Sequence, residues 1–179
     1  MPPNPDSLLK VNSEPPSGLT CWINSTDSLT EQLKTQTGDA CLQLLRQEWC
    51  LPNWWDKQVL HIQDKWVMHR EILMHSHQYT CWYARTIVPE KSYKNNACFF
   101  NRLNKEPLTN LIFNNSSVER VSFIRYPITS ETIEYYWLED FMHQHQLVLW
   151  ARLAEYKIHA VDSFYLLELL LPDLLECAV

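Results

Sequence analysis

The chain has 179 residues, a length typical of one domain, and 46% of them are hydrophobic, enough for a sizeable core. Its formal net charge is −6, so we expect no general attraction to nucleic acid or to an anionic membrane. Glycine occurs only at Gly18 and Gly38, which excludes the glycine-rich loops that cradle nucleotide phosphates. An anionic ligand would have to be held by a few local arginines.

The six cysteines form no CxxC pair, and no histidine pair has zinc-finger spacing. We therefore expect no metal site, and we interpret the cysteines as free thiols that act as small buried hydrophobes. The N-terminus has no apolar signal-peptide core, and no apolar run has transmembrane length. These features together indicate a reducing, cytoplasmic location.

The start of the chain is rich in proline, so residues 1–20 are predicted to be an extended lead-in to a folded domain that spans 21–179. Ser28 and Glu31 have the spacing of a capping box, which predicts a short helix that ends near Gly38.

Strands dominate the rest of the pattern. Period-two alternation predicts strands over 41–49, 67–74, 79–88, 149–159 and 163–171. The second and third of these form one hairpin, and a short turn joins the last two.

Helical spacing is predicted over 96–113, interrupted at Pro107, and from Ser130 to His143. Because strands do not alternate regularly with helices, the sequence predicts a single α+β domain with an antiparallel sheet rather than a doubly wound sheet.

Charged residues interrupt apolar strand faces. Arg70 alternates with methionine and isoleucine, and Glu168 alternates with phenylalanine and leucine; Arg85 and Arg152 have similar settings. A buried charge is costly unless it is paired, and a ligand carboxylate can supply the partner of an arginine. The alternative is that Arg70 and Glu168 pair with each other, or that they lie at strand edges in water.

The predicted helix after Ser28 offers a second anion-binding element, because the first amides of a helix, here those of Leu29 and Thr30, lack intrahelical partners. The alternative is a capped helix with no ligand. The histidines complete no familiar metal spacing, so we interpret them as surface or turn residues.

Six motifs occur in one order between about residues 25 and 172. They are Asp27-Ser28-Leu29-Thr30, Arg70-Glu71-Ile72-Leu73-Met74, Ala84-Arg85-Thr86-Ile87-Val88-Pro89, Glu106-Pro107-Leu108 with Phe113, Trp150-Ala151-Arg152 and Glu168-Leu169-Leu170-Leu171-Pro172. In this order and approximate spacing, the chain resembles the bacterial chorismate lyases of ubiquinone biosynthesis.

The resemblance implies a monomer with an internal, flap-covered cavity and an activity that needs no cofactor, the elimination of pyruvate from chorismate to give 4-hydroxybenzoate. It implies that Arg70 binds the ring carboxylate, together with the backbone amides of Leu29 and Leu108, and that Glu168 contacts the ring hydroxyl. Arg70 and Glu168 are therefore the expected catalytic residues. Arg85, or as a second choice Arg152, is expected to meet the enolpyruvyl carboxylate.

The chain also departs from the family pattern. Leu29 replaces a methionine, and Thr109, Ala84 and Ala151 replace glycines. The chain is longer between Phe113 and Trp150, and the surplus, assigned to the helix at 130–143, would cover the cavity or form a partner surface.

A rival hypothesis is a non-catalytic module that binds aromatic acids, like the effector-sensing domains of transcription regulators that share this fold. The acidic charge and the absence of a preceding DNA-binding segment argue against a regulator.

Overall fold

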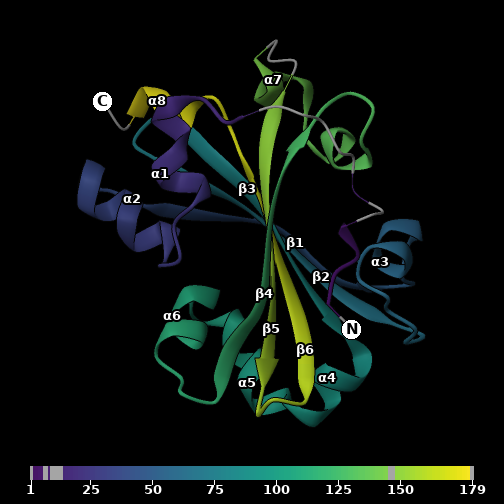
Figure 1. Ribbon diagram of the computed structural model, residues 1–179. Helices are drawn as coiled ribbons and strands as arrows, with labels where there is room; N and C mark the ends of the chain where they lie inside the picture. The colour runs from purple at the N-terminus through teal and green to yellow at the C-terminus, as the bar shows by residue number, and fades with distance from the viewer. Residues whose placement is uncertain (1, 6–7, 9–13, 145–147, 178–179) are drawn as a thin grey trace.

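A six-stranded antiparallel sheet, with strand order β1-β2-β3-β6-β5-β4, forms the centre of the molecule (Figure 1). This computed structural model describes all residues except 1, 6–7, 9–13, 145–147 and 178–179. The strands are β1 (Cys41–Cys50), β2 (Val67–Ser76), β3 (Tyr79–Pro89), β4 (Val118–Ile128), β5 (Leu149–Ile158) and β6 (Asp162–Leu170). The predicted α+β class is confirmed, as are both hairpins.

The helices are short. They are α1 (Thr20–Ile23), α2 (Leu29–Thr37), α3 (Trp54–Gln58), α4 (Glu90–Asn95), α5 (Ala97–Phe100), α6 (Leu108–Phe113), α7 (Asp140–His143) and α8 (Asp173–Cys177), with 3₁₀ turns η2 (Ser17–Leu19), η3 (Asn101–Asn104) and η4 (Ile133–Trp137). Helix α2 begins as predicted, because Ser28 Oγ accepts the Glu31 amide at 3.2 Å. It ends at Gly38, whose φ of 80° suits glycine.

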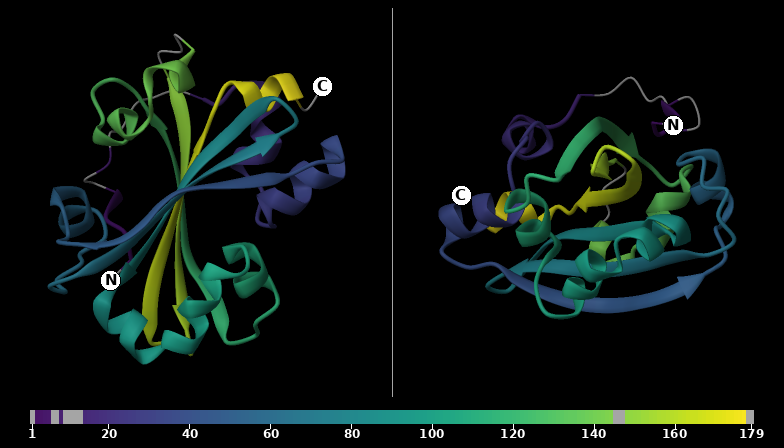
Figure 2. Two further views of the ribbon diagram at one scale, coloured as in Figure 1. Left: turned by 180° about the vertical axis from the view of Figure 1, so that it is seen from behind. Right: turned by 90° about the horizontal axis from the view of Figure 1, so that it is seen from below.

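The sheet has two covered faces, which we name by their arginines. The Arg70 face carries Arg70, Ile72, Thr86 and Glu168, and it packs against α1, α2 and α8 at one end and α5 and α6 at the other. The Arg85 face packs against α3 and the segment that contains η4 and α7. From behind, α2 and α6 lie on one side of the sheet, and α3 and η4 lie on the other (Figure 2).

The predicted helix over 130–143 is wrong. Leu138 and Glu139 have extended backbone angles, which separate η4 from α7. The segment packs on the Arg85 face, where Leu138 and Met142 join the core, so it does not cover the cavity beside Arg70. Strand β4 was not predicted. It is an edge strand that is only partly buried, and its register with β5 shifts at Val121.

Several smaller interpretations are also corrected. Of the cysteines, only Cys81 is buried, whereas three are exposed. His69 is a core residue, 4% exposed and 3.1 Å from Asp56, not a surface residue; His143 is buried as well. His145 lies outside the described residues. In the lead-in, Leu8 packs into the core. The domain boundary at residue 20 stays a prediction.

Candidate functional site

Arg70 is a buried cation without a partner. It lies in the middle of β2, is 5% exposed, and its Nε donates no hydrogen bond. Within the described ranges, no carboxylate lies at ion-pair distance from it, and burial lowers the pKa of its guanidinium. The desolvation of one buried, unpaired ion costs on the order of several kcal/mol. This position therefore favours a bound anion.

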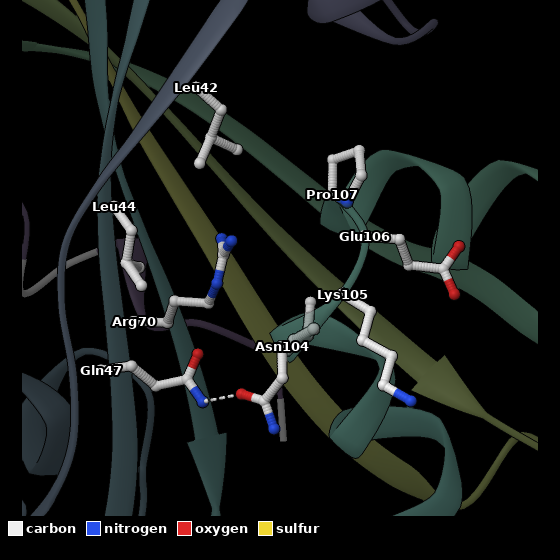
Figure 3. Close-up of a pocket in the computed structure, with 9 residues that line it drawn as sticks. Leu42, Leu44, Gln47, Arg70, Asn104, Lys105, Glu106 and Pro107 are labelled. Carbon is white, nitrogen blue, oxygen red and sulfur yellow. Dashed lines mark hydrogen bonds between the residues drawn. The ribbon is translucent and has the colours of Figure 1, made fainter.

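Two cavities meet at Arg70. The outer one has a volume of about 530 Å³ and is open, and the inner one has about 40 Å³. Figure 3 shows the Arg70 side chain between Leu42 and Leu44 of β1 and Pro107 of the segment ahead of α6. Below it, Gln47 donates a 3.1 Å hydrogen bond to Asn104 and so joins β1 to η3.

The inner cavity is closed down in this structure. Its volume of about 40 Å³ is well below the roughly 300–1,000 Å³ of pockets that enclose small-molecule ligands. A ring-sized ligand requires the covering segments to move. On one side these are Leu42 on the edge strand β1, and on the other Pro107 and Leu108. The wall that they cover belongs to the middle of the sheet, which is fixed by pairing on both sides.

Glu168 also lines the inner cavity, from β6, which lies two strands away from β2. Its Oε2 is 3.3 Å from Arg152 Nε, and it makes no ion pair with Arg70. The alternative that Arg70 and Glu168 neutralise each other is therefore wrong, as is the alternative that Arg70 faces water at an edge. Burial raises the pKa of the Glu168 carboxyl, and the charges of Arg152 and Arg120 partly offset this rise.

Arg152 ties the N-terminal segment to the sheet. Its Nη1 donates to the Trp22 carbonyl at 2.8 Å, and its Nη2 donates to the Ser25 carbonyl at 3.1 Å. These carbonyls flank the loop that leads into α2. Arg152 thereby links the Glu168 carboxylate to the loop that carries Leu29.

Both expected amide donors begin helices. Leu29 is the first residue of α2, and Leu108 is the first residue of α6. First-turn amides have no intrahelical acceptor. Leu108 and Thr30 line the inner cavity, which brings both helix starts to the Arg70 face. Thr109 lies within the first turn of α6, where helical backbone angles suit threonine, so its replacement of glycine strains nothing.

Arg85 lies on the opposite face of the sheet. Its Nη2 is 2.8 Å from Glu71 Oε1, its Nε donates to the Tyr83 hydroxyl at 3.0 Å, and its guanidinium stacks on Trp137 at 3.7 Å. The structure therefore does not bring Arg85 to the cavity with Arg70 and Glu168. Of the two alanines that replace glycines, Ala84 lines the inner cavity, whereas Ala151 packs on the Arg85 face.

The sequence pattern did not indicate one charged residue near the site, Arg120. Arg120 lies on β4, and its charge lowers the Glu168 pKa. The shift in register at Val121 breaks the alternation that would have marked this strand and its inward arginine.

Among the residues that the structure describes, no three His, Cys, Asp or Glu side chains are grouped to hold a metal ion. None of the described helices is long and apolar enough to cross a bilayer.

Comparison with known families agrees with this geometry. A family model described as chorismate lyase matches residues 9–175. The chain belongs to the chorismate lyase family. A probable chorismate pyruvate-lyase from Pseudoalteromonas atlantica (strain T6c) is 30% identical over 117 residues, 62% of this chain and 59% of that protein. The match to this chorismate lyase relative thus spans less than two thirds of the relative's length.

Solved structures share the fold of this chorismate lyase family member. The C-terminal domain of a histidine utilization repressor from Pseudomonas syringae has a TM-score of 0.54 at 9% identity, over 75% of this chain and 92% of that one. The effector domain of PhnF from Mycobacterium smegmatis has a TM-score of 0.52 at 12% identity, over 83% and 91%. A GntR-family ligand-binding domain from Bordetella bronchiseptica has a TM-score of 0.51 at 12% identity, over 76% and 85%. Such low identities show a common fold only.

Proposed function

We propose that the protein is a chorismate pyruvate-lyase, which eliminates pyruvate from chorismate and leaves 4-hydroxybenzoate. The observation that carries the proposal is that the buried Arg70, which has no anionic partner among the described residues, lines the same cavity as Glu168. A flat ring with a carboxylate at one end and a hydroxyl at the other matches this pair of groups. Membership of the family supports the same substrate.

The substrate itself supplies most of the driving force. Loss of the C4 hydrogen and cleavage of the C3–oxygen bond make the ring aromatic, and the enolpyruvyl group leaves and becomes pyruvate. The protein has to hold the ring, favour the departing charge and exclude water. No step requires an electron acceptor or a second substrate.

The described residues divide these tasks. Arg70 and the amides of Leu29 and Leu108 bind the ring carboxylate, since a guanidinium fork makes two parallel hydrogen bonds to a carboxylate. Glu168 accepts a hydrogen bond from the 4-hydroxyl and assists the proton transfer. Burial raises the pKa of Glu168, which makes the carboxylate a stronger base than one in water.

Because the inner cavity is closed, we infer that the segments that cover it move during turnover. They open to admit the ring and close to exclude water, and product leaves by the same movement.

The test is to incubate the purified protein, dialysed against a chelator, with chorismate and to follow 4-hydroxybenzoate and pyruvate together. Equal amounts of both are expected, and Arg70→Ala should abolish most of their formation. A second candidate function is an aromatic-acid sensor without turnover, which the likeness to GntR-family ligand-binding domains favours. Binding of 4-hydroxybenzoate with no consumption of chorismate would establish that function instead.

A further inference from the structure

The cations on the Arg70 face differ in what already occupies them. Arg152 donates through both Nη atoms to backbone carbonyls and lies beside Glu168 through Nε. Arg125 is exposed and donates to the Asn24 side chain. Arg120, in contrast, has no carboxylate at ion-pair distance among the described residues. Its guanidinium hydrogen-bonds the Tyr156 hydroxyl and lies over the Phe123 ring, 4.8 Å from the centroid. Like Arg70, it therefore has no anionic partner among the described residues.

Arg120 lines a third cavity of about 580 Å³. The walls come from the end of α6, the turn that follows it, β4 and β5. They consist of Thr26, Ile112, Phe113, Asn114, Asn115, Ser116, Val118, Arg120 and Tyr156. Arg120 is the one charged side chain in this lining, and the other polar groups are neutral hydroxyls and amides. Because no carboxylate occurs among the described residues that line it, the cavity is cationic.

The same helix lines this cavity and the inner cavity. Leu108 and Thr109 of α6 face the inner cavity, and Ile112 and Phe113, one turn later, face the third cavity. Electrostatics connect the two as well. Arg120 lowers the pKa of Glu168, and the Glu168 charge adds to the burial that raises the pKa of Tyr156 to about 12. The third cavity lies over β4 and β5, next to β6, which carries Glu168, and away from β2, which carries Arg70.

The shape of the substrate matches this order of groups. Chorismate carries one carboxylate on C1 and a second on the enolpyruvyl ether at C3, next to the C4 hydroxyl. With the C1 carboxylate on Arg70 and the C4 hydroxyl on Glu168, the enolpyruvyl group leaves the ring sideways, from the carbon next to C4. Its carboxylate then requires a cation to the side of Glu168.

We propose that Arg120 and the cavity it lines bind the enolpyruvyl carboxylate and receive the three-carbon oxo acid when it leaves. This inference rests on the proposed function. The guanidinium fork pairs with the carboxylate, and Phe123 supports the flat side of the guanidinium. Tyr156 keeps its proton at neutral pH, so its hydroxyl can donate to the leaving group.

The experiment compares substrate with product. Arg120→Gln should raise the KM for chorismate about 10- to 100-fold, the range expected for a lost charge-assisted hydrogen bond. The Kd for 4-hydroxybenzoate should not change, because the product lacks the enolpyruvyl group. Arg120→Lys should recover part of the loss, since it restores the charge without the fork. Arg125→Gln is the matched control: it removes the same charge from the same strand but from outside the cavity lining, and it should leave both constants unchanged.

A direct readout separates this inference from the proposed function. Saturation-transfer NMR with pyruvate alone should show binding to the wild type and to Arg125→Gln, and much weaker binding to Arg120→Gln. If the wild type consumes chorismate while Arg120→Gln keeps its KM, the subsite is refuted and the lyase function stands. If Arg120→Gln weakens the binding of 4-hydroxybenzoate as much as that of chorismate, the subsite is refuted as well. If the wild type lacks turnover but binds pyruvate through Arg120, the lyase function fails and the anion subsite is supported.

Discussion

Arg152 and Glu168 face each other across β5 and β6 at directly paired positions, with Arg152 Nε 3.3 Å from Glu168 Oε2. The contact is an ion pair without hydrogen-bond alignment, because that Nε is a buried donor with no hydrogen-bond partner. Arg152 therefore supplies positive charge to the carboxylate while its hydrogen bonds go to the loop ahead of α2. The carboxylate oxygens stay available to a ligand hydroxyl.

Replacement of Arg152 should move the pH dependence of turnover. Burial raises the Glu168 pKa, and the positive charge of Arg152 lowers it, so Arg152→Met should raise it further. If catalysis needs the ionised carboxylate, the acid limb of kcat/KM shifts to higher pH. Arg152→Lys keeps a charge and should shift the limb less. Profiles of kcat/KM against pH check this, and identical acid limbs in all three proteins would contradict it.

Replacement of Glu168 separates a chemical role from a structural one. Glu168→Gln should lower turnover about 10²- to 10⁴-fold, the usual contribution of a general acid or base, and should keep 4-hydroxybenzoate binding. Because burial raises the folded-state pKa of Glu168, its protonated form contributes stability that is lost as the pH rises through that pKa. The neutral amide avoids this loss, so Tm at neutral pH should not fall. A stable variant with full turnover would refute the catalytic role.

The elements that position the site were predictable where the strand pattern is regular. In β2 and β6, the residues two positions before and after Arg70 and Glu168 are apolar, which places both charges on apolar faces from the sequence alone. The choice between Arg85 and Arg152 was not predictable, since it depends on which face of each strand turns toward the cavity. A shift of one residue exchanges the two faces, and the pairing of β3 with β6 turns Arg85 away.

The helical spacing of the segment after β4 led to a wrong prediction for a physical reason. Its residues Ile133, Tyr136 and Phe141 have helical spacing, but they are 41%, 69% and 62% exposed, so this stripe is not the packing face. Burial falls instead on Leu138 and Met142, which anchor the segment to the Arg85 face. Tertiary contacts with this face decided the backbone, and no local pattern recorded them.

Two thiols are placed to form a disulfide. Cys81 Sγ on β3 lies 3.5 Å from Cys177 Sγ on α8. Oxidised glutathione should convert them by thiol–disulfide exchange, releasing two reduced glutathione molecules, and intact mass should fall by two hydrogens. Burial raises the pKa of both thiols, so the exchange should be slow at neutral pH and faster as the pH rises.

The bond should also stabilise the fold. Closing a loop of about 100 residues contributes about 2–4 kcal/mol in typical cases, which raises Tm by several degrees. Differential scanning calorimetry with and without a reductant measures the change, and Cys177→Ser serves as the control that shows no dependence on the oxidant. An unchanged mass after prolonged oxidation at alkaline pH would show that the two thiols do not approach each other in solution.

The last prediction concerns Arg70, for which binding and stability should change in opposite directions. Arg70→Met removes a buried cation that no described residue neutralises, so Tm of the ligand-free protein should rise. The same change should weaken the binding free energies of both chorismate and 4-hydroxybenzoate by about 2–5 kcal/mol. This is the usual result of removing one partner from a buried charge-assisted contact. Adding 4-hydroxybenzoate should therefore raise Tm of the wild type but not of the variant.

Arg85→Met is the matched control, because Arg85 is equally buried, on the other face, and paired with Glu71 at 2.8 Å. Its loss leaves the Glu71 carboxylate with a half-exposed partner, Arg46, and should lower Tm, since breaking a buried ion pair typically costs about 3–5 kcal/mol. Binding of 4-hydroxybenzoate to the folded protein should persist. Thermal melts with a ligand titration give both quantities for each variant. If Arg70→Met instead melts lower than the wild type and still binds 4-hydroxybenzoate, Arg70 is a structural cation and the ring carboxylate is held elsewhere.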